Sequence, residues 1–150
     1  MRAMQLKFKL GVLVVVGVFA YAAVSSASTT TVVLGSRGFA GAQGVGWGTA
    51  HPIEIFNGGD PSGLVTHIRW SSWGGGTASG HGKNAIFKPQ GGYYKQEVTI
   101  QLRATDRGRC TKHGPLAYRR LMVREPSRPG GPDGKWSSWS GSKTLCHFGF

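Results

Sequence analysis

Two cysteines, Cys110 and Cys146, are the residues of this chain with the most definite chemistry. In an oxidising compartment they would pair as a disulfide that closes a 36-residue span. The alternative is a metal site made from Cys110, His113, Cys146 and His147. Adjacent residues of a strand point to opposite faces, so Cys146 and His147 would chelate one ion awkwardly. The sequence favours the Cys110–Cys146 disulfide and no metal site.

The tetrapeptide Trp-Ser-Ser-Trp occurs twice, at Trp70–Trp73 and at Trp136–Trp139. In a strand, residues three apart point to opposite faces, so each pair would send one indole inward and one outward. An outward indole can stack on a sugar or bind a cation over its ring. The alternative interpretation is that these rings pack in the core and cover its edges.

A basic segment runs from Cys110 to Arg128, with Glu125 as its one acidic residue. Combined with the tryptophans, it predicts a candidate binding surface. The predicted surface residues are Trp70, Trp73, Trp136, Trp139, Arg119, Arg120 and Arg124. A nucleic-acid site would need base-stacking aromatic residues among these charges, and Tyr118 alone qualifies.

No catalytic pattern stands out. The five histidines include no pair spaced as in a zinc protease helix, and the six carboxylates suggest no glycosidase pair. Gly80–Ala85 matches the letters of a dinucleotide fingerprint, but Pro89 and Gly91 follow where that motif requires a helix. The sequence therefore predicts no catalytic residue and no cofactor. A small secreted hydrolase that uses a histidine with a carboxylate stays as the alternative.

The first 27 residues read as a secretory signal. Basic residues at Arg2, Lys7 and Lys9 precede an uninterrupted apolar run of 14 residues, Leu10–Ala23, and small residues lead to Ala27. The run is short for a membrane anchor, which needs about 20 apolar residues. We expect export by the general secretory route and cleavage after Ala27. If the signal stays uncleaved, this segment is the one expected to contact the membrane.

Charge and glycine content set the character of the mature chain. Three of the 18 Lys and Arg precede residue 28 and all six Asp and Glu follow it, so the mature part carries a formal charge of +9. This charge favours anionic partners such as cell-wall polymers or glycans, although it also serves simple solubility. Export argues against nucleic acid as the partner. The mature part also holds 23 of the 25 glycines, which disfavour helices.

The elements that position these residues are short strands. Residues 64–70, with Leu64, Thr66, Ile68 and Trp70 on one face, and residues 96–105, with Val98, Ile100, Leu102 and Ala104 facing in, alternate as half-buried strands do. Further strands are expected at 52–56, with Ile53 and Ile55 on one side, at 77–82, and at 117–124, with Tyr118 opposite Leu121. Turns are expected at 106–108 and 126–134.

This pattern predicts an all-β fold, a small β-sandwich or barrel-like domain with one disulfide, preceded by a signal helix. The expected organisation is a signal peptide over 1–27, a flexible Gly-rich lead-in over 28–50 and a β-rich secreted domain over 51–150.

One resemblance spans most of the mature chain. It is carried by Ile68-x-Trp70-x-x-Trp73-Gly74, Ala78-x-Gly80-x-Gly82, Val98-x-Ile100-x-Leu102, Cys110, Tyr118-x-x-Leu121 and Cys146. In this order the residues resemble a family of small secreted actinobacterial proteins with an export signal and a β-rich domain. Many of its members carry a second cysteine pair, which residues 83–96 lack. The resemblance implies a compartment and a fold, and no activity.

The sequence thus predicts a secreted, basic, non-catalytic binding module of the cell envelope or cell surface. A secreted factor that acts against other cells is a further alternative.

Overall fold

The computed structural model describes residues 30–129 and 134–147. The signal segment, with its expected helix and its cleavage site at Ala27, lies outside these residues. Within them, no helix is long and apolar enough to cross a membrane.

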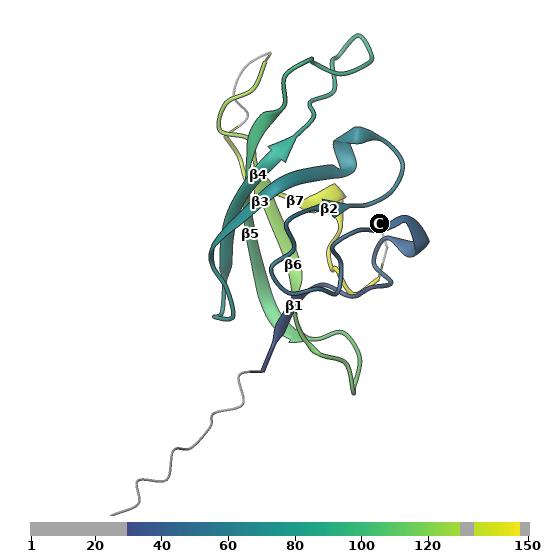
Figure 1. The fold of residues 1–150 in the computed structure, drawn as a ribbon, viewed down its shortest axis with the longest axis vertical. Helices are drawn as coiled ribbons and strands as arrows, with labels where there is room; N and C mark the ends of the chain where they lie inside the picture. The colour runs from purple at the N-terminus through teal and green to yellow at the C-terminus, as the bar shows by residue number, and fades with distance from the viewer. Residues whose placement is uncertain (1–29, 130–133, 148–150) are drawn as a thin grey trace, which may run out of the picture.

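The described chain forms one seven-stranded sheet that curls into a half-barrel (Figure 1). The strand order is β1-β6-β5-β4-β3-β2, and β7 pairs with Met122 and Val123 of β6. The strands are β1 (Val32–Leu34), β2 (Ile55–Phe56), β3 (Leu64–Ser72), β4 (Ala78–Asn84), β5 (Val98–Arg109), β6 (Leu116–Arg124) and β7 (Ser137–Ser138). Three short 3₁₀ turns cover Gly41–Gln43, Pro61–Gly63 and Trp139–Gly141. The all-β prediction is confirmed, with one curled sheet in place of two packed layers.

The central strand β5 carries the alternation that its sequence predicts. Val98, Ile100, Leu102 and Ala104 are all buried on the inner, concave face. The strand is longer than expected, because it continues through Asp106–Gly108 to Arg109, and the predicted turn there is wrong. Asp106 takes a positive φ of 58° within the strand, which a short polar residue tolerates better than most.

Strand β6 changes its buried side beside Asp106. Tyr118 and Leu121 are three residues apart, yet they are 0% and 1% exposed and belong to the same core. The prediction that they lie on opposite faces is therefore wrong. The change falls where Asp106, with its positive φ, lies opposite Arg119, and the register of β5 with β6 is the same on both sides of it.

Strand β3 also departs from simple alternation. Val65 and Ile68 are buried, whereas the sequence pattern placed them on opposite faces. The register with β4 shifts between Thr66 and Arg69, and His67 within this bulge has a positive φ of 52°. The extra residue of a β-bulge moves the following side chains to the other face, which the two-residue period cannot anticipate. Earlier in the chain, Ile53 is 75% exposed although Ile55 is buried, because β2 begins only at Ile55.

Residues 32–50 belong to the folded body, which corrects the prediction of a flexible lead-in. Strand β1 pairs in parallel with β6, and the side chains of Phe39 and Trp47 are buried in the core. The glycines here permit close approach of the backbone. At Gly46, with φ of 80°, a Cβ atom would stand 2.1 Å from the carbonyl oxygen of Glu54. In this segment glycine serves tight packing and does not make the chain flexible.

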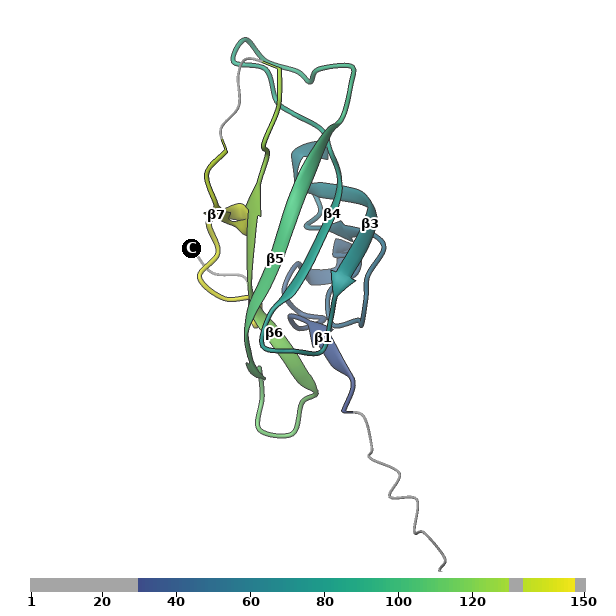
Figure 2. The same ribbon diagram turned by 90° about the vertical axis from the view of Figure 1, so that its left-hand side faces the viewer.

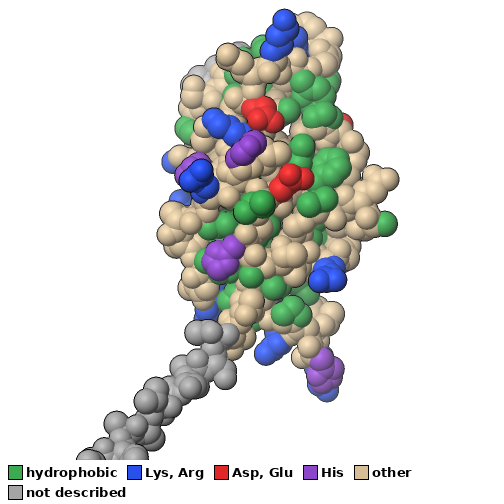
Figure 3. All heavy atoms as spheres, viewed as in Figure 1, with side chains coloured by type: hydrophobic (Ala, Val, Ile, Leu, Met, Phe, Trp, Pro, Cys, Tyr) green, Lys and Arg blue, Asp and Glu red, His purple; other side chains and the backbone are tan. Residues whose placement is uncertain are grey.

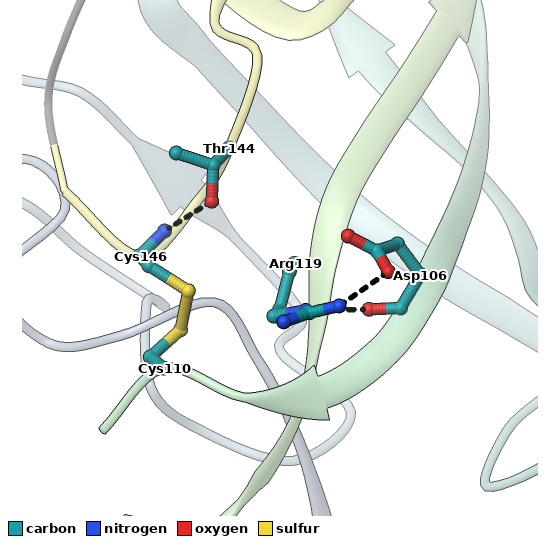
Figure 4. A network of polar contacts seen from close by, with 5 residues as sticks. All are labelled: Asp106, Cys110, Arg119, Thr144 and Cys146. Atoms are coloured by element: carbon teal, nitrogen blue, oxygen red, sulfur yellow. Dashed lines mark hydrogen bonds and ion pairs between the residues drawn. A yellow bond between two sulfur atoms is a disulfide. The ribbon is translucent and has the colours of Figure 1, made fainter. Parts of the chain in front are cut away.

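The predicted disulfide is present. Cys110, just beyond β5, is bonded to Cys146 with a Cα–Cα distance of 5.0 Å (Figure 4). The C-terminal segment also attaches through the Leu145 amide, which donates to the carbonyl oxygen of Arg119 at 2.7 Å. The Leu145 side chain is buried. The segment 135–147 is thereby fixed against β6.

Candidate anion-binding face

Three of the four predicted surface tryptophans lie in or against the core, on the inner face of the half-barrel. Trp139 is 4% exposed, and its Nε1–H donates to the side-chain oxygen of Asn57 at 2.9 Å. Its ring centroid lies 6.4 Å from that of Trp47, which is also buried. Trp139 is therefore a core residue and is not available for binding.

Trp70 and Trp73 are half-buried against the same core. Their indole N–H groups donate to backbone carbonyls, Trp70 to Pro52 at 2.9 Å and Trp73 to Val32 at 3.0 Å. The two rings meet edge to face at 4.6 Å, and Trp73 also contacts Tyr118 at 5.2 Å. These contacts agree with the core-packing interpretation of this pair.

Two glycines of β4 make room for this arrangement. A Cβ at Gly80 would stand 3.0 Å from the ring of Trp70, and one at Gly82 would stand 2.5 Å from a methyl group of Val65. The letters that mimic a dinucleotide fingerprint therefore serve the packing of β4 on β3.

Trp136 is the one predicted tryptophan on the outer face of the sheet. It precedes β7, whose pairing with β6 places Ser137 opposite Val123. The guanidinium carbon of Arg103, from β5, lies 4.3 Å from the centroid of the Trp136 ring, and that of Arg124, from β6, lies 4.9 Å away. Two cations on one indole make a cation–π cluster in which Trp136 and Arg124 are half-buried and Arg103 is exposed.

The two arginines differ in their hydrogen bonds. Arg124 donates from Nε to the side-chain oxygen of Gln101 at 2.5 Å. Among the described residues, the side chain of Arg103 has no hydrogen-bond or ion-pair partner, so its guanidinium N–H groups remain available to a ligand. Sequence reasoning selected Arg124 and Trp136 but missed Arg103. Arg103 could have been identified from its outward position in β5, the strand with the clearest alternation.

A shallow hollow of about 370 Å³ adjoins this cluster on the outer face, onto which Figure 2 looks. Strands β3, β4 and β5 cross this view with no loop in front of them. The lining contains hydroxyl, amide and imidazole groups and, among the described residues, no carboxylate. The polar lining residues are Ser71, Ser79, His81, Thr99, Gln101, Arg103 and Arg124, with the ring of Trp136.

The other two predicted arginines lie apart from this hollow. Arg119 forms an ion pair with Asp106 at 2.6 Å, beside the disulfide (Figure 4). Arg120 is exposed and pairs with Thr105 in the ladder, outside the lining of the hollow. Of the seven predicted surface residues, only Trp136 and Arg124 meet at the hollow. The other three tryptophans lie in or against the core, and Arg119 and Arg120 lie elsewhere on the surface.

The described residues assemble no obvious catalytic centre. Within them, no ion pair joins a histidine to a carboxylate, and no group of three or more His, Cys, Asp and Glu could hold a metal. His67 contacts the hydroxyl of its neighbour Thr66. Hydrogen bonds from the Ser62 hydroxyl and then from Tyr93 lower the pKa of the exposed Asp60. That carboxylate caps the 3₁₀ turn Pro61–Gly63, so its contacts serve local structure.

Comparisons with family models, with curated proteins and with solved structures gave no match for this chain. The hollow and its cation–π cluster are therefore interpreted from their own chemistry.

Proposed function

We propose that this protein is an exported, non-catalytic module that binds anionic polymers of the cell envelope through the outer-face hollow. The observation that carries the proposal is the cluster of Arg103 and Arg124 on Trp136. Two cations stand side by side there, and the described residues that line the hollow include no neutralising carboxylate.

The indole helps binding by holding the guanidinium groups in place before the ligand arrives. A free arginine loses side-chain entropy when a ligand fixes it, and stacking on an aromatic ring reduces that loss. Arg103 keeps its donors for a carboxylate or phosphate, to which guanidinium groups can donate two parallel hydrogen bonds. Hydroxyl and amide groups around it suit the hydroxyls of a sugar or polyol.

The expected location outside the cytoplasm favours a polymer of the cell envelope as the ligand. The disulfide is compatible with an extracellular protein, and the first 27 residues read as an export signal. The net positive charge of the chain would add long-range attraction to a polyanionic surface, and this attraction is weakened by salt.

Removing the cluster should abolish most of this binding. We expect Arg103→Ala and Trp136→Ala each to weaken binding to isolated cell wall by about tenfold, the effect of losing roughly 1.4 kcal/mol of charge-assisted contact. Co-sedimentation with wall fragments over a protein concentration series measures the change. Binding by the wild-type protein should also fall at high salt.

Arg120→Ala is the matched control, because it removes the same charge from an exposed site outside the hollow. If Arg120→Ala weakened binding as much as Arg103→Ala, attraction would come from overall charge and the proposed site would be wrong. A wild-type protein that stays in the supernatant with or without wall would contradict the function itself.

A further inference from the structure

We propose that the ligand is a linear anionic glycan that lies along a track on the outer face, from Trp136 to the hairpin at Tyr94. This inference rests on the proposed function and gives the ligand its shape. The hollow beside Trp136 is the first part of the track.

Three hollows adjoin one another along β5 and the residues before it. The hollow beside Trp136 shares Thr99 with a second hollow of about 480 Å³. The second shares Gln96 and Pro129 with a third of about 440 Å³, which reaches Tyr94. The strand portion from Arg103 to Val98 alone spans about 17 Å, so the track is long for a single sugar unit.

Cations recur along this track. Arg103 and Arg124 stand at one end, and Lys83 lines the second hollow, where its ammonium donates to the Thr99 hydroxyl at 3.1 Å. At the far end Lys88 lies 5.6 Å from the centroid of the Tyr94 ring, and Lys95 lines the same hollow. Such a series matches a polymer that bears a negative charge on each repeating unit. Glu97 also lines the second hollow, where its carboxylate would repel a ligand that places a negative charge next to it.

The spacing of aromatic rings favours a glycan over a nucleic acid. Single-stranded nucleic acids are bound by aromatic side chains on which successive bases stack. Here large aromatic rings border the two ends, Trp136 and Tyr94. The described lining between them consists of polar, charged and aliphatic side chains, with His81 as its one imidazole. Intervening hydroxyl and amide groups are suited to sugar hydroxyls.

The hairpin that carries the far end is held in place by the fold. Its turn closes through the Lys88 amide, which donates to the Gly92 carbonyl at 2.8 Å, and Ile86 at its base is buried. The Tyr93 hydroxyl donates to Asp60 at 2.9 Å, which ties the hairpin to the loop before β3. Figure 1 shows this hairpin, at the end of β4, projecting beyond the sheet.

The test is the dependence of affinity on chain length, with galacturonic acid, its dimer, tetramer and octamer as probes in calorimetric titrations of the mature protein. We expect affinity to rise with length. The double variant Lys88→Gln/Lys95→Gln should weaken octamer binding by about fivefold, as expected for two exposed charge contacts. It should leave the dimer unaffected, while Arg103→Ala should weaken both probes. Lys143→Gln, an exposed lysine outside the three hollows, is the control.

The outcomes separate the track from the proposed function. An octamer that binds no tighter than the dimer, with Arg103→Ala still harmful, would overturn the track and leave the single hollow intact. Failure of every uronate probe together with failure to sediment with cell wall would overturn both. Tighter binding of single-stranded oligothymidylate than of an octamer with equal charge would overturn the assignment to a glycan.

Discussion

At the scale of the residue, the outer face of the sheet depends on how the inward side chains of β4 and β5 pack. Arg103 and His81 can point outward because their neighbours in β5 and β4 pack inward, and in β4 those neighbours are mostly small. Gly80 and Gly82 let β4 approach Trp70 and Val65 so closely that any side chain there would collide. The sequence shows these glycines plainly, but it does not show which large side chain each one faces.

Gly82→Ala should therefore destabilise the protein by about 1–3 kcal/mol, the usual cost of overpacking a core. The added methyl group would meet Val65 at 2.5 Å and the Thr66 carbonyl oxygen at 2.8 Å. Urea denaturation followed by tryptophan fluorescence measures the change. Gly76→Ala is the control, since nothing lies within 4 Å of its added methyl group. Equal midpoints for the two variants would contradict the packing argument.

At the scale of the element, hydrophobic periodicity predicts β5 well and its neighbours less well. Four inward residues of β5 are in their expected places because that half of the strand is regular. Strands β3 and β6 lose the two-residue period at His67 and beside Asp106, where positive φ values occur at non-glycine residues. Such conformations are set by tertiary packing and are not visible in an alternation pattern. For the candidate site, the sequence predicted Trp136 and Arg124 but not Arg103, and the grouping of all three depends on the pairing of β7 with β6.

The segment 32–50 is the element that sequence reasoning assigned wrongly, and its role can be tested by truncation. A chain that begins at residue 51 would lose Val32, Leu34, Phe39 and Trp47 from the core. Large core deletions cost about 2–5 kcal/mol each, and small domains have only about 5–15 kcal/mol in total. We therefore expect this truncated chain to lack cooperative thermal unfolding and near-ultraviolet circular dichroism, both of which a chain beginning at residue 28 should show. A truncated chain that unfolds cooperatively would contradict the integral role of the segment.

At the scale of the whole molecule, the half-barrel has one covered face and one open face. The segment 35–60 and the C-terminal segment enclose the concave side, where the core lies, while the convex side of β3–β5 is uncovered (Figures 1 and 2). In the view of Figure 3, Lys and Arg side chains lie along the left-hand edge and at both ends. That left-hand edge is the side that Figure 2 shows face on.

The disulfide is expected to supply a large share of the stability of this small fold. Replacing both cysteines, Cys110→Ser with Cys146→Ser, should lower the free energy of unfolding by about 3–4 kcal/mol, mainly because the unfolded chain regains the entropy of a 36-residue loop. Chemical denaturation of this variant checks the value, and reduced wild-type protein should behave in the same way. An unchanged denaturation midpoint would show that the remaining contacts of residues 135–147 suffice.

The docking of the C-terminal segment also has a consequence for maturation. Trp136 reaches the outer face from the same 13-residue segment, 135–147, that pairs with β6 through β7 and ends in the bond from Cys146 to Cys110. The cation–π cluster on the outer face is therefore completed only when this segment docks on β6. A chain whose cysteines are reduced would lack the covalent link that holds this segment, and with it the indole of Trp136, beside the two arginines. Formation of the disulfide and placement of the indole over the arginines are therefore coupled through one segment of the chain.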